Sequence, residues 1–107
     1  MPLTRYNKLV RDKILDITEA SGKACTAEVL SEDEYLRMID VKLDEELAEY
    51  HKTPNLEELA DLLEVLRAAV IARGHTLDEF ELVRAQKMAQ RGGFVRKLLL
   101  KEVIEYE

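Results

Sequence analysis

Three stretches of the chain repeat apolar residues every three or four positions, which is the period of an amphipathic α-helix. Each stretch begins with a capping-box sequence, in which a Ser, Asn or Thr is followed three residues later by Glu. The three boxes are Ser31 with Glu34, Asn55 with Glu58, and Thr76 with Glu79. Glycines follow the second and third stretches and commonly end helices. The pattern therefore predicts helices from residue 31 to about 51, from 55 to about 73, and from 76 to about 91.

A shorter apolar pattern at residues 11–20, followed by Gly22, predicts a further helix near the N-terminus. Residues 25–30 and 94–106 contain apolar or β-branched residues without a clean helical stripe. We interpret these two segments as short strands that pair with each other. The expected architecture is all-α, with four helices and a short β-hairpin appendage.

The length of 107 residues and the hydrophobic fraction of 47% fit one domain over residues 1–107. A chain of this size builds only a thin core, so self-association would help to stabilise it. The helix expected at residues 55–73 is apolar on nearly all sides, which is typical of a helix buried from several directions. We therefore expect a homodimer or homotetramer with this helix near the subunit interface.

Charge and cysteine content narrow the functional class. The 22 acidic and 16 basic residues leave a net charge of −6, which argues against binding a nucleic-acid polymer. Cys25 is the single cysteine, so an intrachain disulfide and a cysteine-based zinc site are excluded. No apolar run has the length of a signal peptide or a membrane span. We expect a cytoplasmic protein that does not bind membranes.

An acidic residue interrupts the apolar stripe of the helix expected at residues 31–51. Glu46 lies in the middle of that stripe, three residues after Leu43 and seven after Ile39. Glu49 lies at the edge of the stripe, and Glu45 lies further toward solvent. A carboxylate on a buried face is costly unless it is paired, hydrogen-bonded or bound to a metal. Glu46 therefore needs a partner.

The next helix carries a second acidic pair, Glu58 and Asp61, with the same spacing as Glu46 and Glu49. The short turn between the two helices makes them antiparallel neighbours and brings the four carboxylates together without a matching set of Lys or Arg. Carboxylates suit Mg²⁺, with Mn²⁺ as a substitute. Acids also favour the first helical turn, and Glu58 is explained by its capping role alone. From periodicity, a metal site and a solvated acidic patch both remain open.

At this point the sequence resembles a known pattern. Glu45, Glu46 and Glu49, followed by Glu58 and Asp61, match the EExxE…ExxD signature of the all-α NTP pyrophosphatase superfamily. This superfamily includes the MazG-like, phosphoribosyl-ATP pyrophosphatase and dimeric dUTPase families. The resemblance implies a four-helix MazG-like bundle with Glu46, Glu49, Glu58 and Asp61 as metal ligands. The gap between Glu49 and Glu58 is shorter than usual, which bears on the size of the nucleotide pocket.

Two further segments resemble one MazG-like branch, often labelled phosphoribosyl-ATP pyrophosphohydrolase-like. Residues 6–14 are similar to its opening, and Lys87 with residues 91–94 is similar to its C-terminal motif. The implied reaction is hydrolysis of a nucleoside triphosphate between its α- and β-phosphates, which gives a monophosphate and pyrophosphate. Magnesium would bridge phosphate oxygens and lower the pKa of a bound water. Glu45 or Glu49 is the candidate acceptor of its proton.

Basic residues are candidates for binding the phosphates. Lys87 and Arg91 are one turn apart and can share a ligand, although compensation of the helix dipole explains both positions equally well. Lys8 and Arg11 either contact phosphate or cover the acidic cluster of a neighbouring subunit. Asn7 is assigned to the base through the resemblance.

The role that we favour for this reaction is the clearance of unwanted nucleotides from the cellular pool. Two other functions remain as alternatives. The first is the phosphoribosyl-ATP pyrophosphatase reaction of histidine biosynthesis, which uses the same metal chemistry. The second is a helical regulatory module that lacks catalysis. All four acidic ligands are present, which argues against a decayed site.

Overall fold

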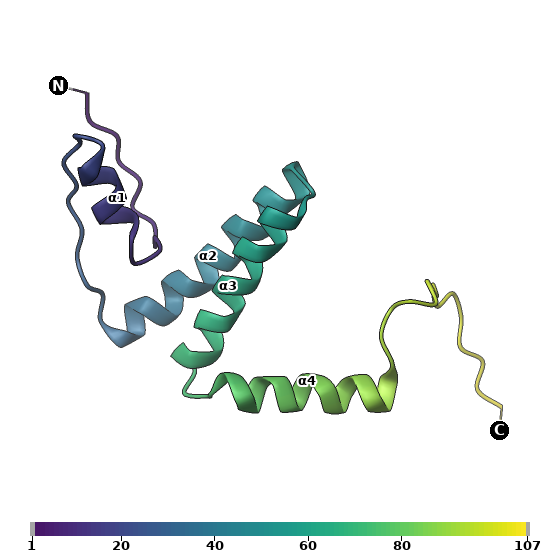
Figure 1. Cartoon of the computed structure of the whole chain (residues 1–107). Helices are drawn as coiled ribbons and strands as arrows, with labels where there is room; N and C mark the ends of the chain where they lie inside the picture. Colours follow the sequence, from purple (N-terminus) through teal and green to yellow (C-terminus); the bar gives the residue numbers. More distant parts are fainter. Residues whose placement is uncertain (1, 107) are drawn as a thin grey trace.

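The computed structural model describes residues 2–106 and contains four α-helices (Figure 1). Their bounds are Ile14–Ala20 for α1, Glu32–Lys52 for α2, Leu56–Ala72 for α3 and Leu77–Arg91 for α4. The all-α prediction is confirmed. Helices α2, α3 and α4 lie where the capping boxes place them, whereas α1 begins three residues later than predicted.

The predicted capping residues begin the three long helices. The side chains of Ser31, Asn55 and Thr76 each accept a hydrogen bond from the backbone N–H three residues later. At Thr76 the bond is reciprocal, because the Glu79 side chain accepts from the Thr76 backbone N–H. These bonds satisfy backbone donors that have no partner within the helix. Local sequence therefore fixes where each long helix starts.

Helix α3 ends in a turn that only glycine adopts readily. Gly74 has a φ of +89°, and the N–H groups of Gly74 and His75 donate to the carbonyls of Ile71 and Val70. This arrangement is a Schellman motif, which satisfies the last carbonyls of the helix. The chain is thereby turned sharply into α4.

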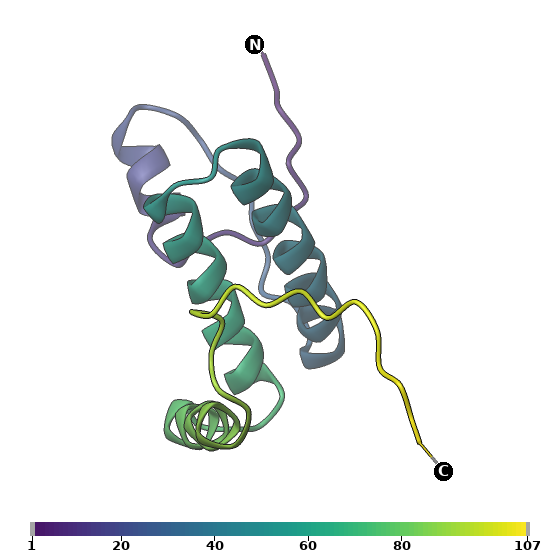
Figure 2. The same ribbon diagram turned by 90° about the vertical axis from the view of Figure 1, so that its right-hand side faces the viewer.

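Helices α2 and α3 form an antiparallel hairpin, and the two views in Figures 1 and 2 show them side by side. Only residues 53–55 separate the two helices, so the C-terminal end of α2 lies beside the N-terminal end of α3. Helix α4 contacts the other end of α3 and then leads away from the hairpin. The hairpin is therefore the main packed unit of the chain.

A single copy does not enclose a core. Among the described residues only Ile39 is buried, at 3% exposure. The chain exposes 10247 Å², whereas a folded monomer of its mass exposes about 6,100 Å². Its radius of gyration is 19.1 Å, against about 13 Å for a compact domain of this length. The apolar faces that a bundle would bury therefore remain largely on the surface.

The predicted β-hairpin is not formed. None of residues 2–106 is in a strand, and the segments 25–30 and 94–106 lie at opposite ends of the molecule (Figure 1). A strand is stable only when a neighbour accepts its backbone hydrogen bonds. Helix α4 carries the second segment away from the first, so neither segment has that neighbour among residues 2–106.

None of the four helices in the described part of the chain combines sufficient length with sufficient apolar content to cross a bilayer.

Candidate metal centre

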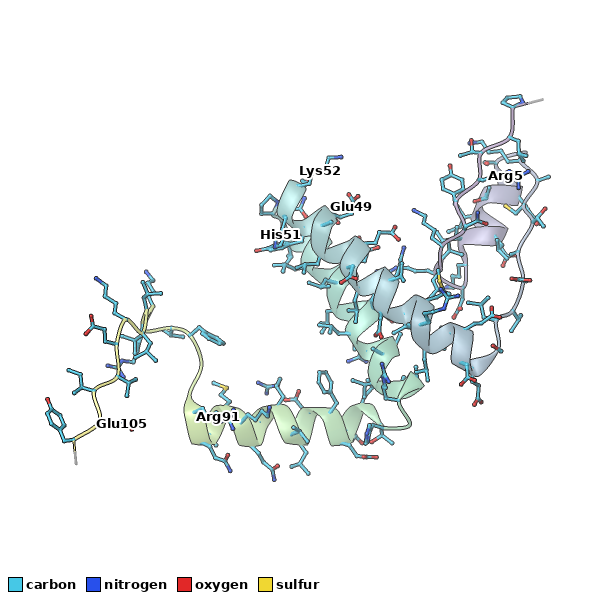
Figure 3. The ribbon with its side chains drawn as sticks, turned by 180° about the vertical axis from the view of Figure 1, so that it is seen from behind. Arg5, Glu49, His51, Lys52, Arg91 and Glu105 are labelled. Carbon is cyan, nitrogen blue, oxygen red and sulfur yellow. The ribbon has the colours of Figure 1, made fainter. Side chains whose placement is uncertain are left out.

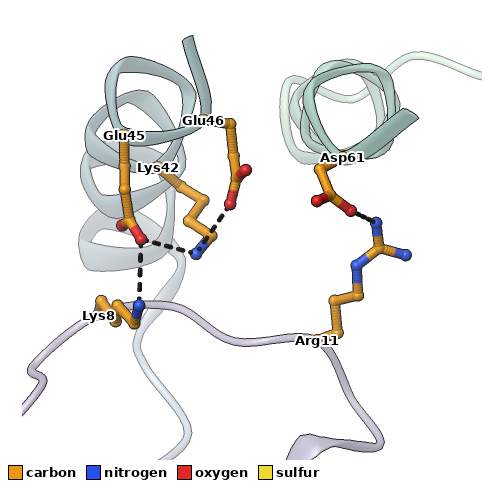
Figure 4. A network of polar contacts seen from close by, with 6 residues as sticks. All are labelled: Lys8, Arg11, Lys42, Glu45, Glu46 and Asp61. Carbon is orange, nitrogen blue, oxygen red and sulfur yellow. Dashed lines mark hydrogen bonds and ion pairs between the residues drawn. The ribbon is translucent and has the colours of Figure 1, made fainter. Parts of the chain in front are cut away.

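The α2–α3 hairpin brings three of the four predicted ligands together. Glu46 comes from α2, and Glu58 and Asp61 come from α3; one carboxylate oxygen of each lies within 4.8 Å of the other two. Figure 4 shows Glu46 and Asp61 facing each other across the gap between the helices. All three residues are half-buried. The tight turn and the one-turn spacing within α3 account for this convergence.

The fourth predicted ligand, Glu49, is exposed and does not belong to the group of three. It lies one helical turn beyond Glu46, near the end of the hairpin (Figure 3). Its charge nevertheless acts on Glu58, since it is one of the carboxylates that raise the pKa of Glu58. Glu49 is therefore a neighbour of the cluster rather than one of its converging members.

Crowding of like charges is centred on Glu58. Loss of hydration raises the pKa of its carboxyl, and the nearby charges of Asp61, Glu49 and Glu46 raise it further. No basic side chain forms an ion pair with Glu58 within residues 2–106. Glu58 is thus the carboxylate of the cluster that gains most from a cation.

Three basic residues, Lys8, Arg11 and Lys42, lie beside the carboxylates of Glu45, Glu46 and Asp61 (Figure 4). Lys42 Nζ lies 3.3 Å from Glu46 Oε1 and 3.2 Å from Glu45 Oε1, and it is only 14% exposed. Arg11 Nη2 lies 2.6 Å from Asp61 Oδ1. The prediction of carboxylates without matching Lys or Arg is therefore wrong for Glu46 and Asp61. Lys42 was missed, although its spacing of three and four residues from Glu45 and Glu46 is that of helical ion pairs.

Glu45 is held by two lysines. Lys8 Nζ and Lys42 Nζ each lie 3.2 Å from its Oε1. Partial burial would raise the pKa of Glu45, but the hydrogen bonds and charges of the two lysines outweigh that effect and lower it. A carboxylate with a lowered pKa is a weaker base. Of the two predicted proton acceptors, Glu49 is therefore the better suited by its surroundings.

The donor set fits a small hard cation. Three carboxylate oxygens are ligands that Mg²⁺ and Mn²⁺ accept, and waters or phosphate oxygens can complete an octahedron. Oxygens bound to one Mg²⁺ lie at most about 4.2 Å apart. The oxygens of Glu46, Glu58 and Asp61 lie within 4.8 Å of one another, and adjacent oxygens on one Mg²⁺ lie about 3 Å apart, so the three side chains would have to draw closer together to bind one ion.

The predicted phosphate-binding residues fall into two groups. Lys8 and Arg11 lie at the acidic cluster, and Asn7 beside them has a φ of +48°. Lys87 and Arg91 lie on α4, where they line a groove of ≈ 400 Å³ with Phe94. Figure 3 shows Arg91 far from Glu49 at the end of the hairpin. Within one chain, the α4 pair therefore does not share a site with the cluster.

Comparisons with known proteins leave the family of the chain open. No family model matches it, and no solved structure matches it. An uncharacterized protein of Mycolicibacterium smegmatis is 50% identical over 42 residues, which cover 39% of this chain and 43% of that protein. The chain thus matches less than half the length of this relative.

The crowding at Glu58 predicts a stability effect. A folded-state pKa raised above the ordinary value of 4.5 means that the ionised carboxylate opposes folding. That cost is present at pH 7 and disappears as the pH falls through the raised pKa. We expect Glu58→Gln to raise the melting temperature at pH 7 in the presence of a chelator, and to have no such effect at pH 4.

Thermal melts at both pH values, with and without Mg²⁺, would measure this effect. Magnesium should stabilise the wild-type protein more than the variant, because the ion relieves the same repulsion. A variant that is less stable than wild type at pH 7 under chelation would contradict the assignment of Glu58 to a crowded cluster.

Proposed function

We propose that the protein is a magnesium-dependent pyrophosphohydrolase that converts a nucleoside triphosphate to a monophosphate and pyrophosphate. The observation that supports this most is the convergence of Glu46, Glu58 and Asp61 from two antiparallel helices. The resemblance to the EExxE…ExxD signature agrees with it, since the same residues occupy the ligand positions of that pattern. Proximity in space and position in the motif thus select overlapping sets of residues.

The surroundings of the cluster suit a triphosphate. In the structure Lys8 and Arg11 compensate the charges of Glu45 and Asp61 from the N-terminal segment. Both pairs are partly exposed to solvent, and ion pairs that are open to solvent are weak. A magnesium ion bound by the carboxylates would neutralise the cluster and polarise phosphate oxygens. Lys8 and Arg11 can then turn to the phosphates without leaving an uncompensated carboxylate behind.

The remaining roles follow from the positions of the side chains. Glu49 is exposed at the edge of the cluster and forms no ion pair within the described residues. We therefore assign it as the general base that accepts a proton from the attacking water. Lys42 stays between Glu45 and Glu46 and holds their carboxylates in place. Phosphoryl chemistry depends mainly on positioning and charge compensation, which these residues supply without a covalent intermediate.

The products identify the reaction. We expect phosphorus NMR of a mixture with Mg²⁺ and a nucleoside triphosphate to show monophosphate and pyrophosphate in equal amounts, with no diphosphate. A panel of ordinary and modified nucleotides should include phosphoribosyl-ATP, because preferential turnover of that compound would assign the protein to histidine biosynthesis. Release of inorganic phosphate and a diphosphate would overturn the proposed bond cleavage. Absence of turnover across the panel would favour the non-catalytic module.

A further inference from the structure

The C-terminal segment, residues 94–106, is an arm that lies apart from the four helices in the described part of the chain (Figure 1). It begins at a turn in which the Lys97 N–H donates to the Phe94 carbonyl at 3.2 Å, and Lys97 has a φ of +58°. Beyond the turn it runs extended and away from the α2–α3 hairpin (Figure 1). Its large apolar side chains are 66–82% exposed at Leu98, Leu99, Leu100, Val103 and Ile104.

An apolar stripe on α3 is also without a partner. Leu62 and Val65 are half-buried on one side of this helix, whereas the stripe on another side is exposed. The exposed fractions along the stripe are 81% for Leu56, 43% for Leu59, 51% for Leu63 and 39% for Leu66. These residues recur every three or four positions and so form one continuous face. We call this face the α3 stripe.

The surface area argues that a second copy covers these faces. The chain exposes 10247 Å², about 4,000 Å² more than a compact monomer of its mass would. Obligate homodimer interfaces bury about 2,000–5,000 Å² or more, summed over both copies. Two copies carry an excess of about 8,000 Å² between them, so a large dimer interface would remove much of it. In a dimer with two-fold symmetry, each copy contributes one arm and one α3 stripe, so two identical contacts between an arm and a stripe can form.

Charge also favours another copy of this acidic chain. The arm carries three basic side chains, all within residues 94–101, and two acidic ones, Glu102 and Glu105, in a chain with a net charge of −6. The α3 stripe is flanked by acids, including Glu57 and Glu64. Arg67 also lies on this border, so Arg96, Lys97 and Lys101 meet opposite charge at Glu57 and Glu64 in a register that keeps them away from Arg67.

We propose that the arm of each copy docks on the α3 stripe of a second copy, so that the protein is an arm-exchanged homodimer. The apolar side chains of the arm fill the face that α3 leaves open, and the basic residues of the arm lie beside Glu57 and Glu64. This assembly is independent of the proposed activity and is expected with or without metal and nucleotide.

The first test uses arm substitutions that would be harmless in an isolated chain. The double variant Leu99→Asp/Ile104→Asp changes two exposed side chains, so helicity by circular dichroism should be unchanged. Sedimentation velocity should show a dimeric wild type and at least about a 100-fold weaker dimer for the variant. Val29→Asp is the matched control, because Val29 is 101% exposed and lies outside both surfaces. A monomeric wild type, an unaffected double variant, or equal dissociation by the control would overturn the proposal.

The second test needs no substitution. A sample refolded from a mixture of isotope-labelled and unlabelled full-length chains allows filtered NOE spectra to detect contacts between copies alone. We expect contacts between copies from methyl groups of Leu99 and Ile104 to those of Leu59 and Leu63. Arm contacts that occur only within one chain, or arm resonances at random-coil positions, would show that the arm does not exchange.

Discussion

Asp61→Asn is expected to lower magnesium-dependent pyrophosphate release at least about 1,000-fold, because the variant loses one of three charged ligands that converge on the ion. That factor corresponds to about 4 kcal/mol of lost transition-state stabilisation. Glu46→Gln should have a similar effect, since Glu46 is the ligand supplied by α2. The measurement is the initial rate of pyrophosphate release at saturating nucleotide and magnesium.

Asp44→Asn is the matched control for this prediction. Asp44 is an exposed carboxylate of α2, two residues before Glu46 and therefore on the opposite side of the helix. The control should keep the wild-type rate, and all three variants should keep wild-type helicity by circular dichroism. If Asp61→Asn and Glu46→Gln turn over at the rate of Asp44→Asn, the catalytic site lies elsewhere.

Removal of divalent cations is expected to reduce turnover to the uncatalysed background. Addition of excess Mg²⁺ or Mn²⁺ should restore it, because a set of carboxylates accepts both ions. The same ions should stabilise the fold, by about 2.7 kcal/mol when the metal concentration is 100 times its dissociation constant. Asp61→Asn should lose this stabilisation. Full turnover in the presence of a chelator would contradict the metal-dependent chemistry.

The positions of the long helices could be predicted because their boundaries depend on neighbouring residues. Ser31, Asn55 and Thr76 cap helices through bonds that span three residues, and Gly74 adopts the backbone conformation that ends α3. The same local logic fails for residues 94–106. Whether an apolar segment becomes a strand depends on a partner for its backbone, and no pattern within the segment identifies one.

The acidic cluster was also partly predictable. Helical spacing and a short turn were enough to bring Glu46, Glu58 and Asp61 together. The exposure of Glu49 and the ion pairs of Lys42 with Glu45 and Glu46 depend on side-chain packing, which periodicity does not describe. The spacing of three and four residues from Lys42 to these glutamates was nevertheless a signal for the ion pairs. The sequence predicted that the core would be thin, but not that Ile39 would be its one buried residue in the described part of the chain. The reason is that sequence does not show which apolar faces meet within one chain.

The most direct test of the account is the position of a bound metal. Crystals of the full-length protein grown with Mn²⁺ and a non-hydrolysable nucleotide would locate the ion through its anomalous scattering. We predict a peak between the carboxylates of Glu46, Glu58 and Asp61, with Lys8 and Arg11 turned toward the phosphates. A structure in which these carboxylates bind no ion and Asp61 remains paired with Arg11 would contradict the proposed metal centre.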